Sequence, residues 1–418
     1  MIWLYRFALF LLSPVLDIWF FIRLLKGKED RHRINERMGQ PQHPRPEGKL
    51  VWIHGASVGE TLSILPLIEA LLAADKTLHV LVTSGTRTSA GLMRERLPAR
   101  AIHQFVPLDY WPAVYMFFNH WRPDVSVFVE SEFWPELLWQ APNPMLVNAR
   151  VSGRAFTRYM RWGWFWHPFL ARFNRCLAQS DADADRLAAL GGRNIAVAGN
   201  LKYDRPAPPA DEAVLKHLQT LIGKRPVLFG AQTHNPEEAV ITTVHAALTQ
   251  AGVKNLLTII APRHPQRGIA IAAELEAQGF TVALRSQGAQ PTSTTQIYIA
   301  DTMGEMGLWC RLATVAVMGG SFIPHGGQNP LEPLMCGTPT ICGPHMHNFT
   351  DMTHYLTHAN AMHLVMDVAD LITALTPLFL KKPALAAARK PIAGALKKQQ
   401  GATLRTADAI RRQLQRVS

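Results

Sequence analysis

The sequence predicts an α/β protein built from two doubly wound domains, and three observations support this prediction. Short runs that are apolar throughout alternate with helical stretches from residue 50 onward, which is typical of parallel strands covered by helices on both faces. The chain has 418 residues, enough for two or three domains of ordinary size. A proline-rich break, RPAPPAD at 205–211, separates two sets of strand–helix units of similar size.

The apolar runs give the expected strands. In the first half they lie at 50–54, 78–83, 125–130, 145–148, 175–180 and 195–200. In the second half they lie at 226–231, 256–262, 297–301, 313–320 and 338–343. We therefore predict a membrane anchor at 1–25, a first domain at 26–205, and a second domain at 206–418 that ends in a basic helix. In such pairs of domains, ligands bind at the carboxyl ends of the strands, in an interdomain cleft.

The amino terminus carries the strongest apolar run, FALFLLSPVLDIWFFI at 7–22. A full membrane span needs about 20 apolar residues, whereas this run has 16 and contains Pro14 and Asp17. Basic residues flank it, as expected for a segment that meets anionic headgroups. This pattern favours a membrane anchor or a partly inserted interfacial helix. An ordinary buried helix and a cleaved signal peptide are the alternatives, although no small-residue cleavage site follows the run.

Composition narrows the class of protein. Apolar residues make up 48% of the chain and charged residues 18%, which excludes a largely disordered or fibrous protein. The net charge of +12 favours anionic partners such as a phospholipid surface, a nucleic acid or a phosphorylated substrate. The four cysteines form no CxxC pair, so the sequence indicates neither a zinc site nor a disulfide framework. Their small number favours a reducing compartment.

The first motif is VWIHGASVGET at 51–61, where an apolar strand enters a small-residue turn and then a helix. Glu60 therefore stands at the carboxyl edge of the first strand, where a carboxylate can act as a general base on a hydroxyl. Ser57 and Glu60 also fit a capping box, in which both residues serve only the helix terminus. The pattern by itself leaves both interpretations open.

The second motif is VFVESEFWPELLW at 127–139. Glu130 ends a buried strand, and Glu132 follows it, so both can line a site. Alternatively, Glu132 and Glu136 are solvated residues that open a helix, where the helix dipole favours them. Glu130 has the better position for function because it terminates the strand itself.

The third motif is GGSFIPHGGQNPLEPLMCGTP at 319–339. A strand enters a glycine-rich loop and a helix begins near Pro330, so backbone N–H groups of the loop and helix start are expected to bind an anion. Glu332 is then placed to accept hydrogen bonds from ribose hydroxyls. In the structural alternative, Asn329 caps the helix with Glu332 as its partner. The four glycines at 319–327 exceed what a cap needs, which favours nucleotide binding.

Three shorter segments follow expected strands or the domain junction. APRHP at 261–265 places Arg263 and His264 after a strand, where arginine can pair with a phosphate. DTMGEMG at 301–307 is placed to close over a base or ribose, and GNLKYD at 199–204 puts Lys202 at the junction. Taken singly, each also fits a purely structural role.

Six arginines and no acidic residue occur between Arg150 and Arg175. Arg154, Arg158 and Arg161 share one face if that stretch is helical, and three tryptophans follow at 162, 164 and 166. Arginines beside aromatic residues suit an anionic lipid surface, and they also suit RNA. A buried aromatic cluster with a solvated basic face is the structural alternative.

Five of these segments together resemble the lipid A Kdo transferase family, in which Kdo is 3-deoxy-D-manno-octulosonic acid. The resemblance rests on HGASVGE (54–60), ESEFWPEL (130–137), GNLKYD (199–204), APRHP (261–265) and GGSFIPHGGQNPLEP (319–333). It implies transfer of Kdo from CMP-Kdo to a lipid A precursor of the lipid IVA type in lipopolysaccharide synthesis. It also implies the GT-B architecture, an inverting reaction without a metal or other cofactor, and anchoring at the cytoplasmic face of the inner membrane.

The resemblance also assigns roles to individual residues. Glu60 matches the general base, and Glu130 and Lys202 match positions that support the transition state. The expected CMP-Kdo contacts are Pro262, Arg263, Met303, Gly304, Glu305, Asn329, Pro330, Leu331 and Glu332. The expected partners are CMP-Kdo, the lipid A precursor and an anionic membrane surface, and nucleic acid is not expected.

Two other classes of protein compete with this interpretation. One is a different GT-B nucleotide-sugar transferase, or an epimerase, that uses a uridine nucleotide. The other is a non-enzymatic basic protein that binds RNA or membrane, which explains the charge but not the strand-end glutamates or the 319–333 loop.

Overall fold

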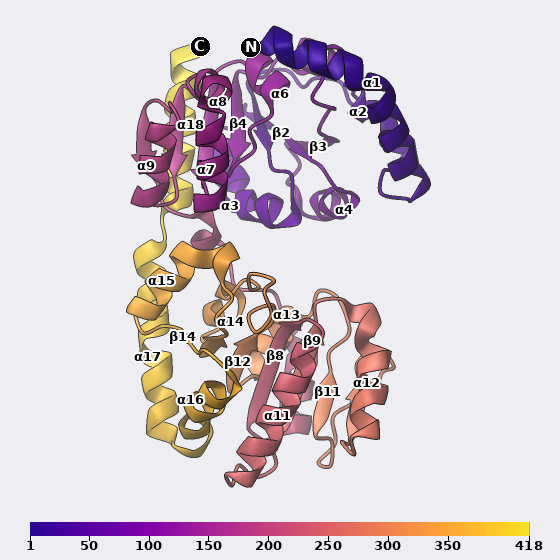
Figure 1. Cartoon of the computed structure of the whole chain (residues 1–418), viewed down its shortest axis with the longest axis vertical. Coiled ribbons are helices and arrows are strands. Elements are labelled where there is room, and N and C mark those ends of the chain that lie inside the picture. Colours follow the sequence, from indigo (N-terminus) through magenta and orange to yellow (C-terminus); the bar gives the residue numbers. More distant parts are fainter. Residues whose placement is uncertain (418) are drawn as a thin grey trace. The chain divides into compact units, whose positions relative to one another are not determined.

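The computed structural model describes residues 1–417, and these form two compact units (Figure 1). The first unit contains residues 1–205 together with residues 399–417, and the second contains Pro206–Lys398. The chain passes from the first unit to the second within the proline-rich segment. Each unit is an α/β layered structure around its own parallel sheet.

The first unit contains a seven-stranded parallel sheet with the order β3-β2-β1-β4-β5-β6-β7. Its strands are β1 (Leu50–His54), β2 (His79–Ser84), β3 (Ala101–Phe105), β4 (Val125–Val129), β5 (Pro144–Ala149), β6 (Arg175–Ala178) and β7 (Ile195–Val197). Its helices are α1 (Ile2–Leu25), η1 (Arg31–Arg33), α2 (Ile34–Arg37), α3 (Val58–Ala74), α4 (Arg87–Arg96), α5 (Trp111–Trp121), α6 (Pro135–Gln140), α7 (Gly153–Arg161), α8 (Gly163–Leu170), α9 (Asp181–Ala189), η2 (Leu201–Asp204) and α18 (Ala402–Val417).

The strand order locates the functional edge of this sheet. After β1 the chain builds β2 and β3 on one side and then returns to place β4 on the other, so β1 and β4 are neighbours where the order reverses. Doubly wound sheets bind ligands at such a reversal, outside the carboxyl ends of the strands. His54 ends β1 and is paired with Phe128 of β4, so the residues that follow both strands emerge together.

Both faces of the first sheet are buried, which explains why its strands are apolar throughout. In β1, Leu50 and Trp52 belong to one hydrophobic core, while Val51 and Ile53 belong to another on the opposite face. All four side chains are fully buried.

The start of α1 is fixed to the first unit by polar contacts. Arg6 donates two hydrogen bonds of 2.7 and 2.9 Å to Glu136, whose side chain is completely buried. The Tyr5 hydroxyl donates to Asp109 Oδ2 at 2.8 Å, and Asp109 also accepts the backbone N–H of Leu137 at the start of α6. Glu136 is therefore a buried ion-pair partner, and the alternative that made it a solvated residue is wrong for this position.

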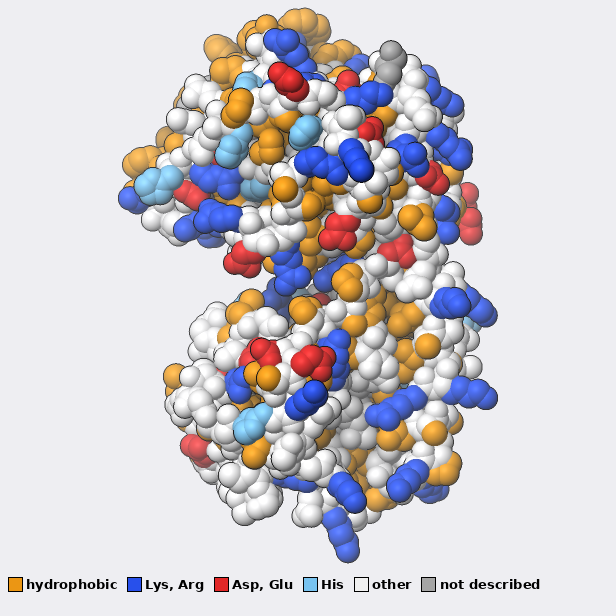
Figure 2. Space-filling view, turned by 180° about the vertical axis from the view of Figure 1, so that it is seen from behind, with side chains coloured by type: hydrophobic (Ala, Val, Ile, Leu, Met, Phe, Trp, Pro, Cys, Tyr) orange, Lys and Arg blue, Asp and Glu red, His pale blue; other side chains and the backbone are white. Residues whose placement is uncertain are grey.

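Elsewhere α1 presents a wide apolar surface, visible as the hydrophobic side chains gathered over this part of the first unit in Figure 2. Among the exposed residues are Trp3, Phe7, Phe10, Leu11, Val15, Ile18, Trp19 and Phe21. No single helix within residues 1–417 has both the length and the apolar composition for a membrane span. Two bent helix pairs have both, Ile2–Leu16 with Ile18–Leu25 (44°) and Val368–Leu380 with Lys382–Val417 (105°).

The C-terminal helix belongs to the first unit, whereas the predicted boundary assigned it to the second. α18 buries Ile410 and Leu414 in the same core as Ile64 of α3. Asp204 accepts hydrogen bonds from the backbone N–H groups of Gly401 and Thr403 at 2.7 and 2.6 Å, which fixes the start of α18. Arginines interrupt the apolar positions of this helix, so the sequence pattern showed only that the chain ends in a basic helix.

The second unit contains a seven-stranded parallel sheet with the order β10-β11-β9-β8-β12-β13-β14. Its strands are β8 (Val227–Thr233), β9 (Leu257–Pro262), β10 (Val282–Leu284), β11 (Ile297–Ile299), β12 (Val315–Met318), β13 (Thr340–Cys342) and β14 (His363–Leu364). Its helices are α10 (Glu212–Ile222), α11 (Glu237–Gln250), η3 (Pro265–Arg267), α12 (Gly268–Ala277), α13 (Met306–Leu312), α14 (Leu331–Met335), η4 (His347–Phe349), α15 (Thr350–His358), α16 (Val368–Leu380) and α17 (Lys382–Gln399). The order reverses between β8 and β12, which places the expected ligand edge there.

The predicted strands are all present, and the structure adds three. These are β3, β10 and β14, each of which lies at an edge of its sheet. Edge strands are covered on fewer sides and tolerate polar residues. β3 (AIHQF) contains a histidine and a glutamine, and β14 has only two residues, so neither carries the apolar signal of a central strand.

Candidate active site

Three glutamates meet at the reversal of the first sheet. Glu60 is the third residue of α3, the helix that follows β1, and Glu130 and Glu132 directly follow β4. Because β1 and β4 are adjacent, their carboxyl ends bring these side chains to one edge. The sequence predicted each position singly, and the strand order brings them together.

Glu60 forms a variant of the capping box that one interpretation predicted, in which its carboxylate accepts the backbone N–H of Ala56 and the hydroxyl of Ser57. Its backbone N–H donates to Ser57 Oγ at 3.3 Å, and the Ser57 hydroxyl donates back to Glu60 Oε1 at 2.7 Å. The backbone N–H of Ala56 donates to Glu60 Oε2 at 2.8 Å. A carboxylate has about four acceptor positions, so the cap leaves acceptor capacity on both oxygens. The cap orients the carboxylate without using all of it.

The surroundings of Glu60 change its proton affinity. Burial raises the pKa of Glu60, and the negative charge of Glu130 raises it further. The charge of Glu132 also raises the pKa of Glu60, whereas the hydrogen bonds from Ser57 and Ala56 lower it. A carboxylate with a raised pKa is a stronger base, which is the property that proton abstraction from a sugar hydroxyl requires.

Glu130 is held in an unusual backbone conformation by a polar network. Its φ is +57°, in the left-handed region, where a residue other than glycine costs about 1–3 kcal/mol. Lys202 Nζ contacts Glu130 Oε1 at 2.7 Å, and the two side chains are only 17% and 15% exposed. Asn148, also left-handed with φ +50°, lies beside this pair and accepts the backbone N–H of Leu201 at 3.0 Å. The network fixes Lys202 against Glu130. The transition-state role that the resemblance assigns to both residues stays a prediction.

Glu132 is turned toward an indole and an imidazole. Trp134 Nε1 donates to Glu132 Oε2 at 2.5 Å, and Nε2 of the fully buried His54 lies 3.6 Å from the same oxygen. Burial alone would raise the pKa of Glu132, but His54 and Trp134 outweigh it and hold this pKa below its usual range. The pKa of Glu132 is therefore shifted in the opposite direction to that of Glu60.

The nine residues expected to contact the donor nucleotide lie at the carboxyl ends of strands of the second sheet or in the segments that follow them. Pro262 ends β9 and is buried, and Arg263 follows it with an exposed side chain. Within residues 1–417 the Arg263 guanidinium makes no ion pair. It is therefore a free positive charge at the carboxyl edge of the sheet.

Met303, Gly304 and Glu305 form the turn before α13. The Met303 side chain is 73% exposed, and Gly304 has a φ of +84°, which suits glycine. Glu305 is paired with Arg285 at 2.6 Å and also accepts a hydrogen bond from the Thr302 hydroxyl. These contacts lower the pKa of Glu305 although burial opposes them. In this structure Glu305 shapes the turn, while Met303 is open to a ligand.

The glycine-rich loop differs from the expectation. The backbone N–H groups of Gly320, Ser321 and Phe322 donate to the carboxylate of Glu237 at 2.6, 3.0 and 2.9 Å. Glu237 lies at the start of α11 and is 2% exposed. These three N–H groups form an anion site, as predicted, but the chain's own carboxylate occupies it. Gly319 is required because a Cβ there would clash with the backbone oxygen of Gln232.

The residues after this loop form a short helix start. Asn329 Oδ1 accepts the backbone N–H of Leu331 at 3.2 Å, while Pro330 and Leu331 are buried. Glu332 Oε2 accepts a hydrogen bond of 2.9 Å from Gln232, the β8 residue with a φ of +57°. Glu332 is thereby held at the reversal between β8 and β12.

Sequence reasoning missed Glu237, Gln232 and His54. Glu237 and Gln232 lie within AQTHNPEE at 231–238, which carries polar residues directly after a strand and was a usable signal. No cluster of three or more histidine, cysteine or carboxylate side chains with the geometry of a metal site is found within residues 1–417. The absence of a metal cofactor stays a prediction.

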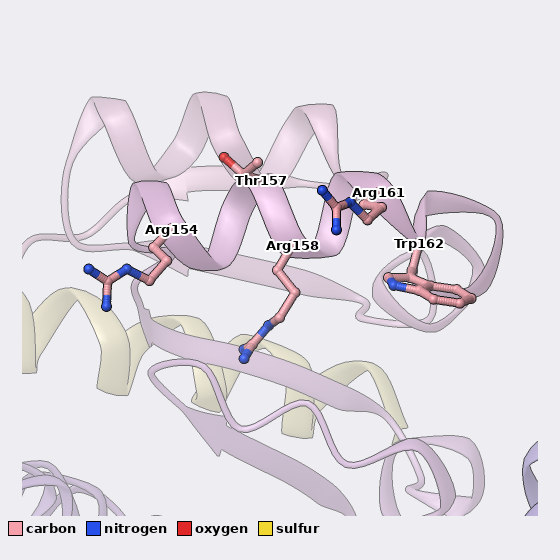
Figure 3. Close-up of a pocket in the computed structure, with 5 residues that line it drawn as sticks. All are labelled: Arg154, Thr157, Arg158, Arg161 and Trp162. Atoms are coloured by element: carbon pink, nitrogen blue, oxygen red, sulfur yellow. The ribbon is translucent and has the colours of Figure 1, made fainter.

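A cationic hollow of about 370 Å³ lies on α7 of the first unit. It is lined by Arg154, Thr157, Arg158, Arg161 and Trp162, and Figure 3 shows Arg154 and Arg158 extending from the same side of the helix. None of the three arginines makes an ion pair within the described part of the chain. The predicted shared face of Arg154, Arg158 and Arg161 is confirmed.

The chain has two doubly wound units, and each gathers polar groups where its strand order reverses. This architecture is the GT-B fold, and solved structures of similar fold support the assignment. A glycosyltransferase from Rickettsia africae superposes with a TM-score of 0.58 at 12% identity, covering 89% of this chain and 100% of that chain. UDP-GlcNAc 2-epimerase from Neisseria meningitidis gives 0.57 at 11% identity, covering 84% and 98%. At such low identity these likenesses show the fold alone.

Sequence relatives define the family. A family model described as 3-deoxy-D-manno-octulosonic-acid transferase matches residues 32–205. The 3-deoxy-D-manno-octulosonic acid transferase of Rickettsia bellii is 34% identical over 375 residues, which cover 89% of each chain. That of Bordetella pertussis is 34% identical over 97% of this chain and 98% of its own. The chain belongs to the 3-deoxy-D-manno-octulosonic acid transferase family and is a glycosyltransferase.

Proposed function

We propose that this glycosyltransferase moves Kdo from CMP-Kdo to a lipid A precursor of the lipid IVA type, during synthesis of the lipopolysaccharide inner core. The names of its relatives support Kdo as the sugar that is transferred. The motifs at Arg263 and at 319–333 support a nucleotide donor on the second unit.

The chemistry is assigned to the glutamates of the first sheet. Glu60 accepts the proton of the acceptor hydroxyl while the hydroxyl oxygen attacks the anomeric carbon of Kdo. The bond between that carbon and the phosphate oxygen breaks, and its electron pair leaves with CMP. A single displacement from the face opposite the leaving group inverts the anomeric centre. The raised pKa of Glu60 supports its role as the base.

Two positive groups support the charges that develop. Lys202, held 2.7 Å from Glu130, is placed to neutralise the Kdo carboxylate or the departing phosphate. Arg263 is assigned to the phosphate of CMP, because it is exposed and unpaired in the described structure at the carboxyl end of β9. The glycine-rich loop is not assigned to the phosphate, since Glu237 already uses its N–H groups.

We propose that the enzyme works at the cytoplasmic face of the inner membrane. The exposed apolar side chains of α1 support insertion into the interface, since a patch of this size is unusual on a protein surface that meets only water. The cationic hollow on α7 supports contact with anionic lipid headgroups or with the phosphates of the acceptor.

The observation that carries the proposal is Glu60, a half-buried carboxylate with a raised pKa at the β1–β4 reversal. The test is Glu60→Gln, because glutamine also completes a capping box and the variant separates the base from the cap. We expect transfer from CMP-Kdo, followed by mass spectrometry of the lipid product, to fall by at least about 10²-fold, the lower end of a general-base contribution. Thermal unfolding is expected to stay close to that of the wild type.

Asp370→Asn is the matched control. Asp370 accepts the backbone N–H of Met366 at 3.2 Å at the start of α16, as Glu60 accepts that of Ala56 at the start of α3, so this variant loses a capping carboxylate away from the site. Its activity should equal that of the wild type. If Glu60→Gln retains most of its turnover, Glu60 is not the base. If UDP competes with the donor better than CMP does, the assigned nucleotide is wrong.

A further inference from the structure

Three imidazoles of the second unit meet at the carboxyl edge of its sheet. His234 follows β8, His264 follows β9, and His325 lies in the glycine-rich loop after β12. The ring centroids of His234 and His325 are 4.2 Å apart, and those of His234 and His264 are 5.9 Å apart. We call these three residues the histidine cluster.

The cluster occupies the position where a doubly wound sheet binds its ligand. β8 and β12 are the neighbours at which the strand order reverses, and β9 is the next strand on the other side of β8. The ends of three strands that are distant in sequence therefore supply one ring each. None of the three rings has a part in the function proposed above.

The surroundings of the cluster are positive and poor in free counter-charge. Arg263 adjoins His264 in sequence and has no ion-pair partner within residues 1–417. Glu237 is engaged by the loop N–H groups, and Glu238 is paired with Arg267 at 2.9 Å. Gln328 Nε2 lies 2.9 Å from His234 Nε2, which fits an amide N–H donating to a neutral ring.

The proton affinity of the central ring reflects this environment. Burial, together with the charges of His325, His264 and Arg263, lowers the pKa of His234 to about 4, while Glu238 opposes the shift. An anion placed among these groups reverses the balance, because its charge favours the protonated imidazoles. Binding of an anion at this edge is then linked to uptake of a proton.

A phosphate monoester is the ligand that fits these groups best. It carries about −1.5 to −2 charges at pH 7 and three strong acceptor oxygens. Imidazolium and guanidinium groups supply the matching donors. The residues do not form a metal site by the geometry found within the described chain.

We propose that the histidine cluster, together with Arg263, binds the phosphate of a nucleoside monophosphate and takes up a proton when it does so. The identity of the nucleotide, CMP, rests on the proposed function. The evidence for the histidine cluster as a phosphate site is the geometry of the three rings and is independent of that function. Release of CMP then becomes easier as pH rises.

The test is isothermal titration calorimetry of the full chain with CMP, in buffers of low and high ionisation enthalpy, between pH 6 and pH 8. We expect net proton uptake by the wild type and an affinity that falls about fivefold or more across this range, within the limit of about tenfold per pH unit for one proton. His264→Gln and His325→Gln, both at exposed rings, should lower the uptake and flatten the pH dependence while the fold is retained.

The chain offers a matched control in His358→Gln. His354 and His358 form a pair of similar geometry, 4.1 Å apart at 34°, on the exposed face of α15. This variant should bind CMP as the wild type does, with the same proton uptake. Protonation of the phosphate itself is common to all variants, so the difference from the wild type isolates the cluster.

The outcomes separate this inference from the proposed function. Equal proton uptake by the wild type, His264→Gln and His325→Gln overturns the histidine proposal, while binding of CMP still supports the donor. If UMP binds with the same cluster-dependent uptake and CMP does not, the donor is wrong and the cluster stands. If CMP, UMP and inorganic phosphate all fail to bind at pH 6, both the histidine proposal and the proposed nucleotide donor are wrong.

Discussion

Single residues in this enzyme serve the fold and the site at once, and Glu60 is the clearest case. Its carboxylate closes a capping box with Ser57 and Ala56, and the same carboxylate lies beside Glu130 and Glu132 at the reversal of the first sheet. If Glu60 is the base, as we propose, the cap fixes its orientation before the acceptor arrives. A positioned base needs no reorganisation at the moment of proton transfer, which favours catalysis.

The charge of Glu130 should be visible in the pH dependence of the reaction. Glu60 must be deprotonated to act as the base, so its raised pKa places the acid limb of kcat/KM above the ordinary carboxyl value of about 4.3. Glu130→Gln removes a negative charge that raises this pKa, so the limb should move to lower pH. The measurement is the pH profile of kcat/KM for the wild type and the variant.

The direction of this shift separates the electrostatic role of Glu130 from a structural one. A variant that only damaged the fold would lower the rate at every pH and leave the limb in place. A limb that stays in place, or moves to higher pH, contradicts the assignment of Glu60 as the titrating base beside Glu130.

Glu237 changes the role expected for the glycine-rich loop. The N–H groups of Gly320, Ser321 and Phe322 form an anion site, and the carboxylate of Glu237 fills it from another helix. Three buried donors would lose their partner without this carboxylate, at about 1–3 kcal/mol each. Glu237 therefore stabilises the loop that carries His325.

Among the elements, α1 and α7 carry the surfaces assigned to the membrane. α1 offers apolar side chains, including Trp3, Phe7 and Phe10, and α7 offers three unpaired arginines in the described structure. Tyr5 of α1 packs against Phe165 of α8, which directly follows α7, so the two surfaces belong to one region of the first unit. Apolar insertion and headgroup attraction then act together.

The arginines of α7 should contribute to binding of anionic vesicles. Replacing Arg154, Arg158 and Arg161 with glutamine should weaken binding about 10²-fold, since each basic side chain near an anionic surface contributes about 1 kcal/mol. Cosedimentation with vesicles that contain phosphatidylglycerol measures this affinity, and raising the salt concentration should reduce the difference.

The control removes the same charge elsewhere. Arg411, Arg412 and Arg416 lie on α18, and their exchange to glutamine should leave vesicle binding nearly unchanged. If both triple variants lose the same affinity, net charge explains the effect and α7 has no special role.

At the scale of the whole molecule, the C-terminal helix links the end of the chain to the first unit. Ile410 and Leu414 lie in its core, and Asp204 holds the start of α18 through Gly401 and Thr403. Burial of two such side chains contributes about 1.5–3 kcal/mol each. That is a large share of the stability of an ordinary domain, which is about 5–15 kcal/mol.

A chain that ends at Lys398 should therefore lose stability in the first unit and keep it in the second. Trp309 is the single tryptophan of the second unit, and the other 10 of the 11 lie in the first, so tryptophan fluorescence in urea reports mainly on the first unit. We expect its midpoint to fall. Asp204→Asn should produce a smaller decrease of about 1 kcal/mol, as for the loss of a helix cap. An unchanged midpoint in the truncated chain would show that α18 is dispensable.

Much of this organisation was readable from the sequence, for physical reasons that particular elements illustrate. The central strands β1 and β8 are buried on both faces and are therefore apolar throughout, so periodicity identified them. The edge strands β3, β10 and β14 are short or polar and gave no such signal. The spacing of Ser57 and Glu60 predicted a helix cap. Such a local pattern does not show which residues from other elements lie near the Glu60 carboxylate.

The two α/β units, the proline-rich segment between them and the resemblance to the family could all be recognised from the order of the residues. The folded structure was needed to show which strands are neighbours, and hence that Glu60 meets Glu130 and that His234 meets His325. It also decided that Glu237 fills the glycine loop and that α18 returns to the first unit. The reason is that backbone periodicity and capping are local, whereas strand order and the partners of buried charges depend on residues far apart in the chain.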